Sequence, residues 1–123
     1  MLDATDREAR LQPAPRPLVL FGVGAAQGVT RGPARLVRGR DELVRLRPDE
    51  VLIVDALPTR WLPVLPTCRA VVTQVGGSLA FSARALRERA IPAVVGAIGA
   101  LDELRDGDLV EVDGYSGIVR VVR

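Results

Sequence analysis

Residues 73–96 read TQVGGSLAFSARALRERAIPAVVG, and this stretch decides the fold of the chain. Residues 70–73, AVVT, form a short apolar and β-branched run, which is typical of a covered strand. Gly76-Gly77 ends that strand, because glycine reaches backbone angles that a Cβ atom forbids. Ser78 then offers a hydroxyl that can cap the first turn of a helix. The stretch therefore opens with a strand, a tight turn and the start of a helix.

The helix predicted over residues 78–90 has one apolar face. Its apolar positions follow helical spacing at i, i+4, i+7 and i+11, namely Leu79, Ala83, Leu86 and Ala90. Ile91-Pro92 ends the helix, and residues 93–95 enter a second buried strand. A Gly-Gly turn that opens a helix leaves free N–H groups at a positive dipole end, which suits an anion.

These residues resemble the swivelling phosphohistidine domain of phosphoenolpyruvate-utilising enzymes, the mobile domain of pyruvate phosphate dikinase and phosphoenolpyruvate synthase. That family reads roughly T-E-x-G-G-x-x-S-H-x-A, then a helical A-R-E and G-I-P-A-V-V-G. The matching positions are Thr73, Gly76, Gly77, Ala83, Arg87, Glu88 and residues 91–96. The resemblance covers about residues 18–122. It implies one α/β domain with three layers, β/β/α, in which helix 78–90 packs on a mixed sheet.

One departure from the family pattern limits the chemistry. The family's phosphorylated histidine falls at Phe81, and the Ser or Thr before it falls at Ala80. The sequence contains no histidine at any position, so no neighbour replaces it. Phosphoryl transfer through a phosphohistidine of this chain is therefore excluded, and we do not expect a phosphotransferase.

The composition predicts one domain with an aliphatic core. The chain has 123 residues, of which 48% are hydrophobic and only 3% aromatic, so Val, Leu, Ile and Ala must fill the interior. Residues 1–17 are polar and interrupted by prolines, and we expect them to form a flexible N-terminal tail. Residues 18–123 then form the swivelling-like domain.

Composition also argues against several classes of partner. The net charge of +2 is carried by Arg residues that alternate with Asp and Glu, without a basic block or interleaved aromatics, so we expect no nucleic acid. No apolar run approaches the roughly 18 residues that cross a bilayer, so we expect no membrane. Cys68 is the single cysteine, which rules out an internal disulfide and suits a reducing cytoplasm.

Shorter strands and helices are expected around the central stretch. Strands are predicted at 18–23, 29–37 with a bulge at Gly32-Pro33, 51–54, and in a hairpin at 109–112 and 118–122. Three short helices are predicted. The first covers residues 41–46 with Asp41 as its N-cap, the second is a single turn with Thr59 as its N-cap, and the third covers residues 98–104. The glycines between 22 and 28 are interpreted as turn and close-packing positions, since no GK[ST] follows them.

Few side chains remain for chemistry, because the sequence has no His, Lys or Asn. No carboxylates lie at ligand spacing near the Gly-Gly turn, so we expect neither metal nor cofactor. Gln74 and Ser78 are the catalytic candidates, since their donors could stabilise a carbonyl oxygen. Trp61 is interpreted either as a ligand-facing wall or as a core anchor. Arg84 either lines the cleft or is solvated.

Phe81 places a large apolar side chain where the family exposes its reactive residue. Such a position favours apolar contact with a small molecule, a partner protein or another copy of the chain, which leaves a homo-oligomer open. The alternative is that Phe81 is turned inward as part of the core. The predicted substrate-binding residues are Trp61, Thr73, Gln74, Ser78, Leu79, Phe81 and Arg84.

Two function classes follow from these observations. In the first, the vacated cleft binds an apolar small molecule and acts as a cofactor-free cyclase of the cycloaddition type, by holding reacting ends together. The resemblance extends to free-standing domains that serve as cofactor-free cyclases in actinobacterial polyketide pathways, which implies natural-product biosynthesis. In the second, the chain is a non-catalytic regulatory or interaction module that docks on a phosphoenolpyruvate- or nucleotide-utilising partner.

Overall fold

The structure is a computed structural model that describes residues 18–76 and 81–122. Within them, eight strands form a sheet in the order β1-β8-β7-β3-β4-β5-β6-β2. The strands are β1 (Val19–Phe21), β2 (Val23–Ala26), β3 (Val29–Val37), β4 (Val51–Val54), β5 (Ala70–Thr73), β6 (Ala93–Val95), β7 (Leu109–Asp113) and β8 (Ile118–Val121). The helices are α2 (Phe81–Glu88), α3 (Ala100–Glu103) and the 3₁₀ helices η1 (Arg40–Arg45) and η2 (Thr59–Val64).

Strand β3 divides this strand order into two sheets and belongs to both of them. The first sheet contains β1, β8, β7 and β3, and the second sheet contains β3, β4, β5, β6 and β2. The first half of β3 pairs antiparallel with β7, and its second half, from Ala34 onward, pairs parallel with β4. We expected a bulge at Gly32-Pro33, but the register with β7 runs through both residues without a shift, so that prediction is wrong. The strand changes partner directly after Pro33 instead. A residue without an N–H is tolerated where a ladder ends.

Strands β1 and β2 form the two outer edges of the sandwich, at the side opposite to β3. They are consecutive in the chain, yet they lie at the two ends of the strand order. We expected one strand followed by a glycine loop, but Val23–Ala26 pair with β6 across a register shift, which corrects that prediction. A Cβ on Gly22 would lie 2.4 Å from the Val95 carbonyl oxygen, and one on Gly24 would lie 2.2 Å from that of Gly114. These glycines therefore permit a close approach of backbones, as their structural interpretation predicted.

Alternation along the central strands separates two cores. One face of β4 and β5 points between the two sheets and the other points toward the helices. The inter-sheet core contains Leu20, Ala34, Val51, Ile53, Ala70, Val72, Val94, Ala97, Ala100, Leu101, Leu104, Val110, Val112 and Val119. The helix-side core contains Ala25, Ala26, Val37, Leu43, Leu46, Leu52, Val54, Leu57, Leu62, Leu65, Cys68, Val71, Ala83, Leu86, Ile91, Ala93 and Val95.

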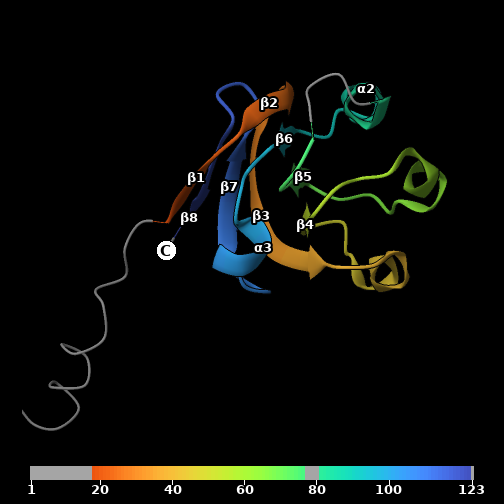
Figure 1. The fold of residues 1–123 in the computed structure, drawn as a ribbon, viewed down its shortest axis with the longest axis horizontal. Coiled ribbons are helices and arrows are strands. Elements are labelled where there is room, and N and C mark those ends of the chain that lie inside the picture. Colours follow the sequence, from red (N-terminus) through yellow and green to blue (C-terminus); the bar gives the residue numbers. More distant parts are fainter. Residues whose placement is uncertain (1–17, 77–80, 123) are drawn as a thin grey trace, which may run out of the picture.

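The helices complete a third layer. Figure 1 shows α2 and the two 3₁₀ helices on one side of the sandwich, with β1, β7 and β8 on the other. This is the predicted three-layer β/β/α arrangement, with β5 and β6 adjacent and parallel, and the prediction is confirmed.

Two predicted helix caps are wrong. Gly39 is the N-cap of η1 and Pro58 that of η2, and neither makes a side-chain capping bond. These residues have the extended backbone angles of a cap, whereas Asp41 and Thr59 already lie inside the helical turns.

Helix α2 ends in a tight C-terminal cap. The N–H of Ile91 donates to the Leu86 carbonyl at 2.9 Å, and the N–H of Ala90 donates to the Arg87 carbonyl at 3.1 Å. Ala90 carries the left-handed angle that this cap requires, with φ of 56°. Glycine is the usual residue there, so an alanine leaves the cap strained.

Candidate functional site

A narrow pocket of about 120 Å³ lies between α2 and the second sheet. The helix contributes Ser82, Ala83 and Leu86; the strands contribute Val71, Thr73, Ala93 and Val95; the turns contribute Ala56, Leu57, Val75 and Gly76. The pocket lies at the first turn of α2, which begins at Phe81, the position where the resemblance places the family's histidine. It is smaller than the roughly 300 Å³ at which pockets for drug-sized ligands begin.

Small residues on both walls create this pocket. Ala83 on α2 is 2% exposed and Ala93 on β6 is fully buried, so both lie at true core positions. Larger aliphatic side chains normally fill such positions, because protein interiors are packed as densely as organic crystals. The space between helix and sheet therefore arises from the sequence itself, through alanines at facing positions.

The two hydroxyls that line the pocket are engaged with the backbone. Thr73 Oγ1 donates to the Val75 carbonyl at 2.6 Å, and Ser82 Oγ donates to the Leu57 carbonyl at 2.7 Å. Both residues are buried. The rest of the lining side chains are apolar, so among the described residues no side chain of the pocket is free to move a proton.

Gln74, a predicted catalytic residue, holds two loops together. Its Nε2 donates to Asp55 Oδ1 at 3.0 Å, and its Oε1 accepts the Leu101 N–H at 2.8 Å. The second bond satisfies a donor in the first turn of α3, which a helix start otherwise leaves open. Gln74 does not line the pocket, and its amide braces the turns after β4 and β5 against α3.

Trp61 and Arg84 lie away from the pocket lining. Trp61 is half-buried and packs against the helix-side core from η2, which matches the interpretation of a core anchor. The side chain of Arg84 is 75% exposed and forms an ion pair with Glu88 at 3.4 Å along α2. This placement matches the solvated alternative for Arg84.

The remaining predicted site residues lie at the edge of what the structure describes. Phe81 is the first residue of α2, but its side chain, together with Ser78 and Leu79, lies outside the described residues. Thr73 is thus the predicted residue that the structure places in the pocket wall. Ser82 and Ala83 were not predicted as site residues. The available signal was the small size of Ala83 on the predicted apolar face of the helix.

Cys68 offers no nucleophile. It is a free cysteine in the helix-side core, 5% exposed. Burial raises the pKa of its thiol to about 11, so it stays protonated near neutral pH. Across residues 18–76 and 81–122, no group of three or more His, Cys, Asp or Glu side chains gathers as a metal site would require.

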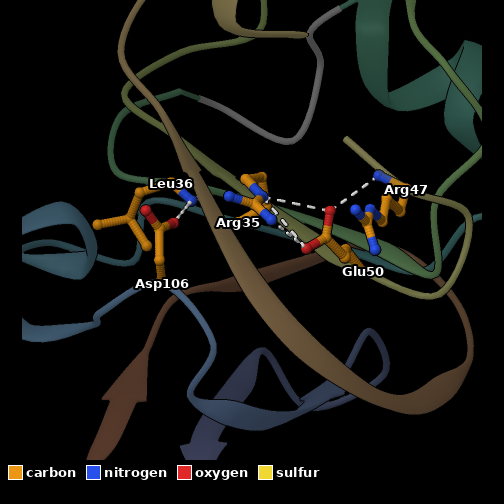
Figure 2. A network of polar contacts seen from close by, with 5 residues as sticks. All are labelled: Arg35, Leu36, Arg47, Glu50 and Asp106. Carbon is orange, nitrogen blue, oxygen red and sulfur yellow. Dashed lines mark hydrogen bonds and ion pairs between the residues drawn. The ribbon is translucent and has the colours of Figure 1, made fainter. Parts of the chain in front are cut away.

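A polar network ties β3 to the turn before β4, on the edge of the helix side (Figure 2). The buried Glu50 carboxylate accepts hydrogen bonds from Arg35 Nη2 at 2.8 Å and from the Arg47 N–H at 2.8 Å. Burial alone would raise the pKa of Glu50, but these bonds outweigh it, and the pKa is lowered. This network contributes to the framework, because none of its members lines the pocket.

Two broader hollows lie elsewhere on the surface. One, of about 610 Å³, lies between η1 and η2, and its lining includes the exposed Val44 and Val64. The other, of about 590 Å³, lies between the C-terminal end of α2 and the β7–β8 turn, and its lining includes Arg87 and Tyr115. Neither reaches the start of α2. In the described part of the chain, no helix is long and apolar enough to cross a membrane.

Known proteins match this chain over most of its length. An uncharacterised phosphotransferase of Bacillus subtilis, YvkC, is 37% identical over 84% of the chain but only 12% of its own length. The chondramide synthase cmdD of Chondromyces crocatus is 41% identical over 84% of the chain and 3% of its own length. The chain therefore spans a small part of the curated relatives that it matches.

A solved structure and a family profile agree with these matches. The solution structure of an Enzyme I protein superposes with a TM-score of 0.58 and 34% identity, covering 64% of this chain and 33% of that one. The profile of the mobile domain of PEP-utilising enzymes matches residues 46–117, which include β4, β5, α2, β6 and β7. The sequence contains no histidine, and the chain belongs to the family of the PEP-utilising enzyme mobile domain.

Proposed function

We propose that this chain is a non-phosphorylatable member of the mobile-domain family that binds a small apolar molecule, or the apolar end of a larger one, between α2 and the second sheet. The observation that carries the proposal is the pocket of about 120 Å³ at the first turn of α2. An apolar cavity of roughly 150 Å³ holds benzene or xenon in another protein, so a pocket of this size can take a single small ring.

The lining supports binding of an uncharged group. Each lining side chain is aliphatic or a hydroxyl that already donates to the backbone. Burial of apolar surface contributes about 25 cal/mol per Å², whereas an unpaired buried charge is strongly unfavourable. A phosphate group is therefore a poor ligand for this pocket, although relatives include a protein named as a phosphotransferase.

A cofactor-free cyclisation is the reaction class that this lining allows. Such a step needs a substrate held in a reactive conformation, and it needs neither a metal nor a titrating side chain. A relative within a chondramide synthase supports a role in natural-product biosynthesis. The pocket alone is too small for a whole polyketide, so the substrate would insert one end and extend over the start of α2.

Cavity-filling variants test the binding proposal. Ala83→Leu adds volume inside the pocket, whereas Ala85→Leu makes the same change on the same helix outside the pocket lining. Benzene and toluene should raise the thermal midpoint of the wild-type chain and of Ala85→Leu, since a ligand that binds the native state stabilises it. Ala83→Leu should lose that shift. An equal shift in all three proteins would place the ligand elsewhere.

A docking module is the second candidate, favoured by two exposed apolar residues beside the pocket mouth. Val75 is 51% exposed and Ile98 is 85% exposed. They lie on the turns after the adjacent strands β5 and β6, which the Ala97 N–H joins to the Thr73 carbonyl at 2.9 Å. Exposed apolar residues at such a place suit a protein partner. Ile98→Ser should weaken binding to a nucleotide- or phosphoenolpyruvate-utilising partner while leaving ring binding intact, because Ile98 does not line the pocket.

The prediction that the chain accepts no phosphoryl group can be tested directly. Incubation with phosphoenolpyruvate and a competent partner enzyme should leave the intact mass unchanged, because the sequence has no histidine to carry the group. Phe81→His serves as the matched variant, since it restores the family's residue at that position. An acid-labile adduct of one phosphoryl mass on the wild-type chain would refute this part of the proposal.

A further inference from the structure

We infer that the pocket beneath α2 selects a small ring that presents a hydrogen-bond donor, an N–H or O–H group, to Thr73 and Ser82. The inference rests on the proposed function, because it names the chemical class of the ligand that the same pocket takes. It comes from the direction of two hydrogen bonds in the pocket wall.

A Thr or Ser hydroxyl carries one hydrogen and two acceptor lone pairs. Thr73 directs its hydrogen to the Val75 carbonyl, and Ser82 directs its hydrogen to the Leu57 carbonyl. Each bond is short, at 2.6 and 2.7 Å. Whatever part of either oxygen reaches the pocket can therefore accept a hydrogen bond but not donate one.

These hydroxyls are not free to reverse their direction. Both residues are nearly buried, Thr73 at 4% and Ser82 at 5% exposure. If either hydroxyl turned toward a ligand acceptor, its backbone carbonyl partner would lose its bond inside the protein, which costs more than a neutral hydrogen bond returns. A ligand donor, in contrast, adds a bond without breaking one.

The residues that line the pocket besides Thr73 and Ser82 disfavour charged ligands. These other lining residues are aliphatic or glycine, so they offer no side-chain partner for an ion. The ligand class is therefore a neutral flat ring with one donor, such as a pyrrole or phenol group. A carboxylate, a phosphate or an ammonium group is excluded by its desolvation.

The test compares five-membered aromatic rings of similar size that differ chiefly in their hydrogen-bonding group. Pyrrole presents an N–H donor, furan presents an acceptor oxygen, and thiophene presents neither strongly. Affinities for the full 123-residue chain are measured by titration in NMR spectra and compared with the partition of each ring from water into an alkane. Pyrrole should exceed furan at least fivefold beyond what partition predicts.

Variants then locate the source of the preference. Thr73→Val and Ser82→Ala should each reduce the excess for pyrrole without reducing affinity for thiophene, whereas Thr73→Ser keeps the hydroxyl and should preserve the excess. Thermal melts establish that each variant is folded. If Ser82→Ala fails to fold, the wild-type ring series and the Thr73 pair still decide the matter.

The outcomes separate the inference from the proposed function. If all three rings bind in the order of their partition, the donor preference is refuted and the binding pocket stands. If furan exceeds pyrrole, N–H groups in the first turn of α2 face the ligand, and the inference is wrong. If none of the rings binds at millimolar concentration, the proposed function itself fails, and the inference falls with it.

Discussion

The two cores of this domain are built in different ways. The inter-sheet core is aliphatic, and Val51, Ile53 and Val72 within it are fully buried. The helix-side core is equally apolar in composition, but it contains a pocket and is bordered by polar bonds. Ser82 bonds the Leu57 carbonyl, and Arg89 donates to the Leu62 carbonyl at 3.0 Å.

This difference separates stability from function within one small chain. The inter-sheet core depends on the packing of buried aliphatic side chains, so it should respond chiefly to loss of volume. The helix-side layer leaves space at facing alanines and is held partly by hydrogen bonds and charge. It should respond to pH, to polar substitutions and to ligands. The variants below test that division.

The largest effect is expected from truncation in the inter-sheet core. Ile53→Ala should lower the free energy of unfolding by about 4 kcal/mol, because the tightly enclosed site cannot collapse around the loss. Leu86→Ala should cost only about 2–3 kcal/mol, since Leu86 already borders the pocket and has fewer contacts to lose. Urea unfolding followed by circular dichroism measures both. Equal losses would show that the two cores are packed alike.

The next effect is expected at the Glu50 network. Glu50→Gln leaves Arg35, whose side chain is 27% exposed, without its counter-charge. The free energy of unfolding should fall by about 2–4 kcal/mol, as for other partly buried pairs that lose one partner. Asp49→Asn is the control, because it neutralises an exposed carboxylate next to Glu50. A similar loss in both variants would contradict a specific role for the network.

Phe81→Ala should weaken ring binding tenfold or more, which corresponds to about 1.4 kcal/mol. We expect this because Phe81 begins the helix that forms the pocket wall. The loss of stability should stay below the roughly 3–5 kcal/mol of a fully buried Phe. Titration with toluene and a urea melt of the same preparation measure both quantities. A large loss of stability with unchanged binding would instead assign Phe81 to the core.

Acid should destabilise the helix side gradually. The pKa of Glu50 in the folded chain is lowered from its ordinary value of 4.5, which is the value in the unfolded chain. The ionised carboxylate therefore makes its full contribution to the free energy of unfolding at pH values above 4.5. The contribution is lost as pH falls below 4.5 through the lower pKa of the folded state. The gap in unfolding free energy between wild type and Glu50→Gln should therefore narrow between pH 5 and pH 3. A constant gap would mean that the carboxylate does not titrate with folding.

The smallest effect is expected at the end of α2, and it is a gain. Ala90→Gly should raise the free energy of unfolding by about 0.5–1 kcal/mol, because glycine adopts the left-handed angle at Ala90 without strain. Ala85→Gly, inside the same helix, should instead cost about 1 kcal/mol. A loss at both positions would show that the cap carries no strain.

The strands whose residues form a continuous apolar run could be predicted from the sequence alone. The strands at 51–54, 70–73 and 93–95 and the hairpin at 109–122 were predicted because their apolar runs and turn residues are continuous. The strand at 23–26 was missed because its composition, VGAA, reads as a loop. The strand forms because it pairs with β6, about seventy residues away in the sequence. It also requires Gly22 and Gly24, because a Cβ atom at either position would collide with the backbone of a neighbouring segment.

The candidate site was predictable only in outline. The helix that follows the Gly-Gly turn could be predicted from its motif, and Thr73 does line the pocket beside it. The partners of the polar groups could not be predicted, since Ser82 bonds a residue 25 positions away and Gln74 one that is 27 positions away. Side-chain chemistry in the sequence does not reveal that both partners are backbone groups.

The joining of β1 to β8 has a mechanical consequence. The Leu18 carbonyl accepts the Val121 N–H at 3.0 Å, so both ends of the described domain emerge at one place, on the side of the sandwich away from α2 (Figure 1). Polypeptide attached before or after the domain would thus act as a paired tether at a single point. Rotation about that point would carry α2 and its pocket, on the other side of the sandwich, through an arc, while tension on the tether would load β1 and β8 first.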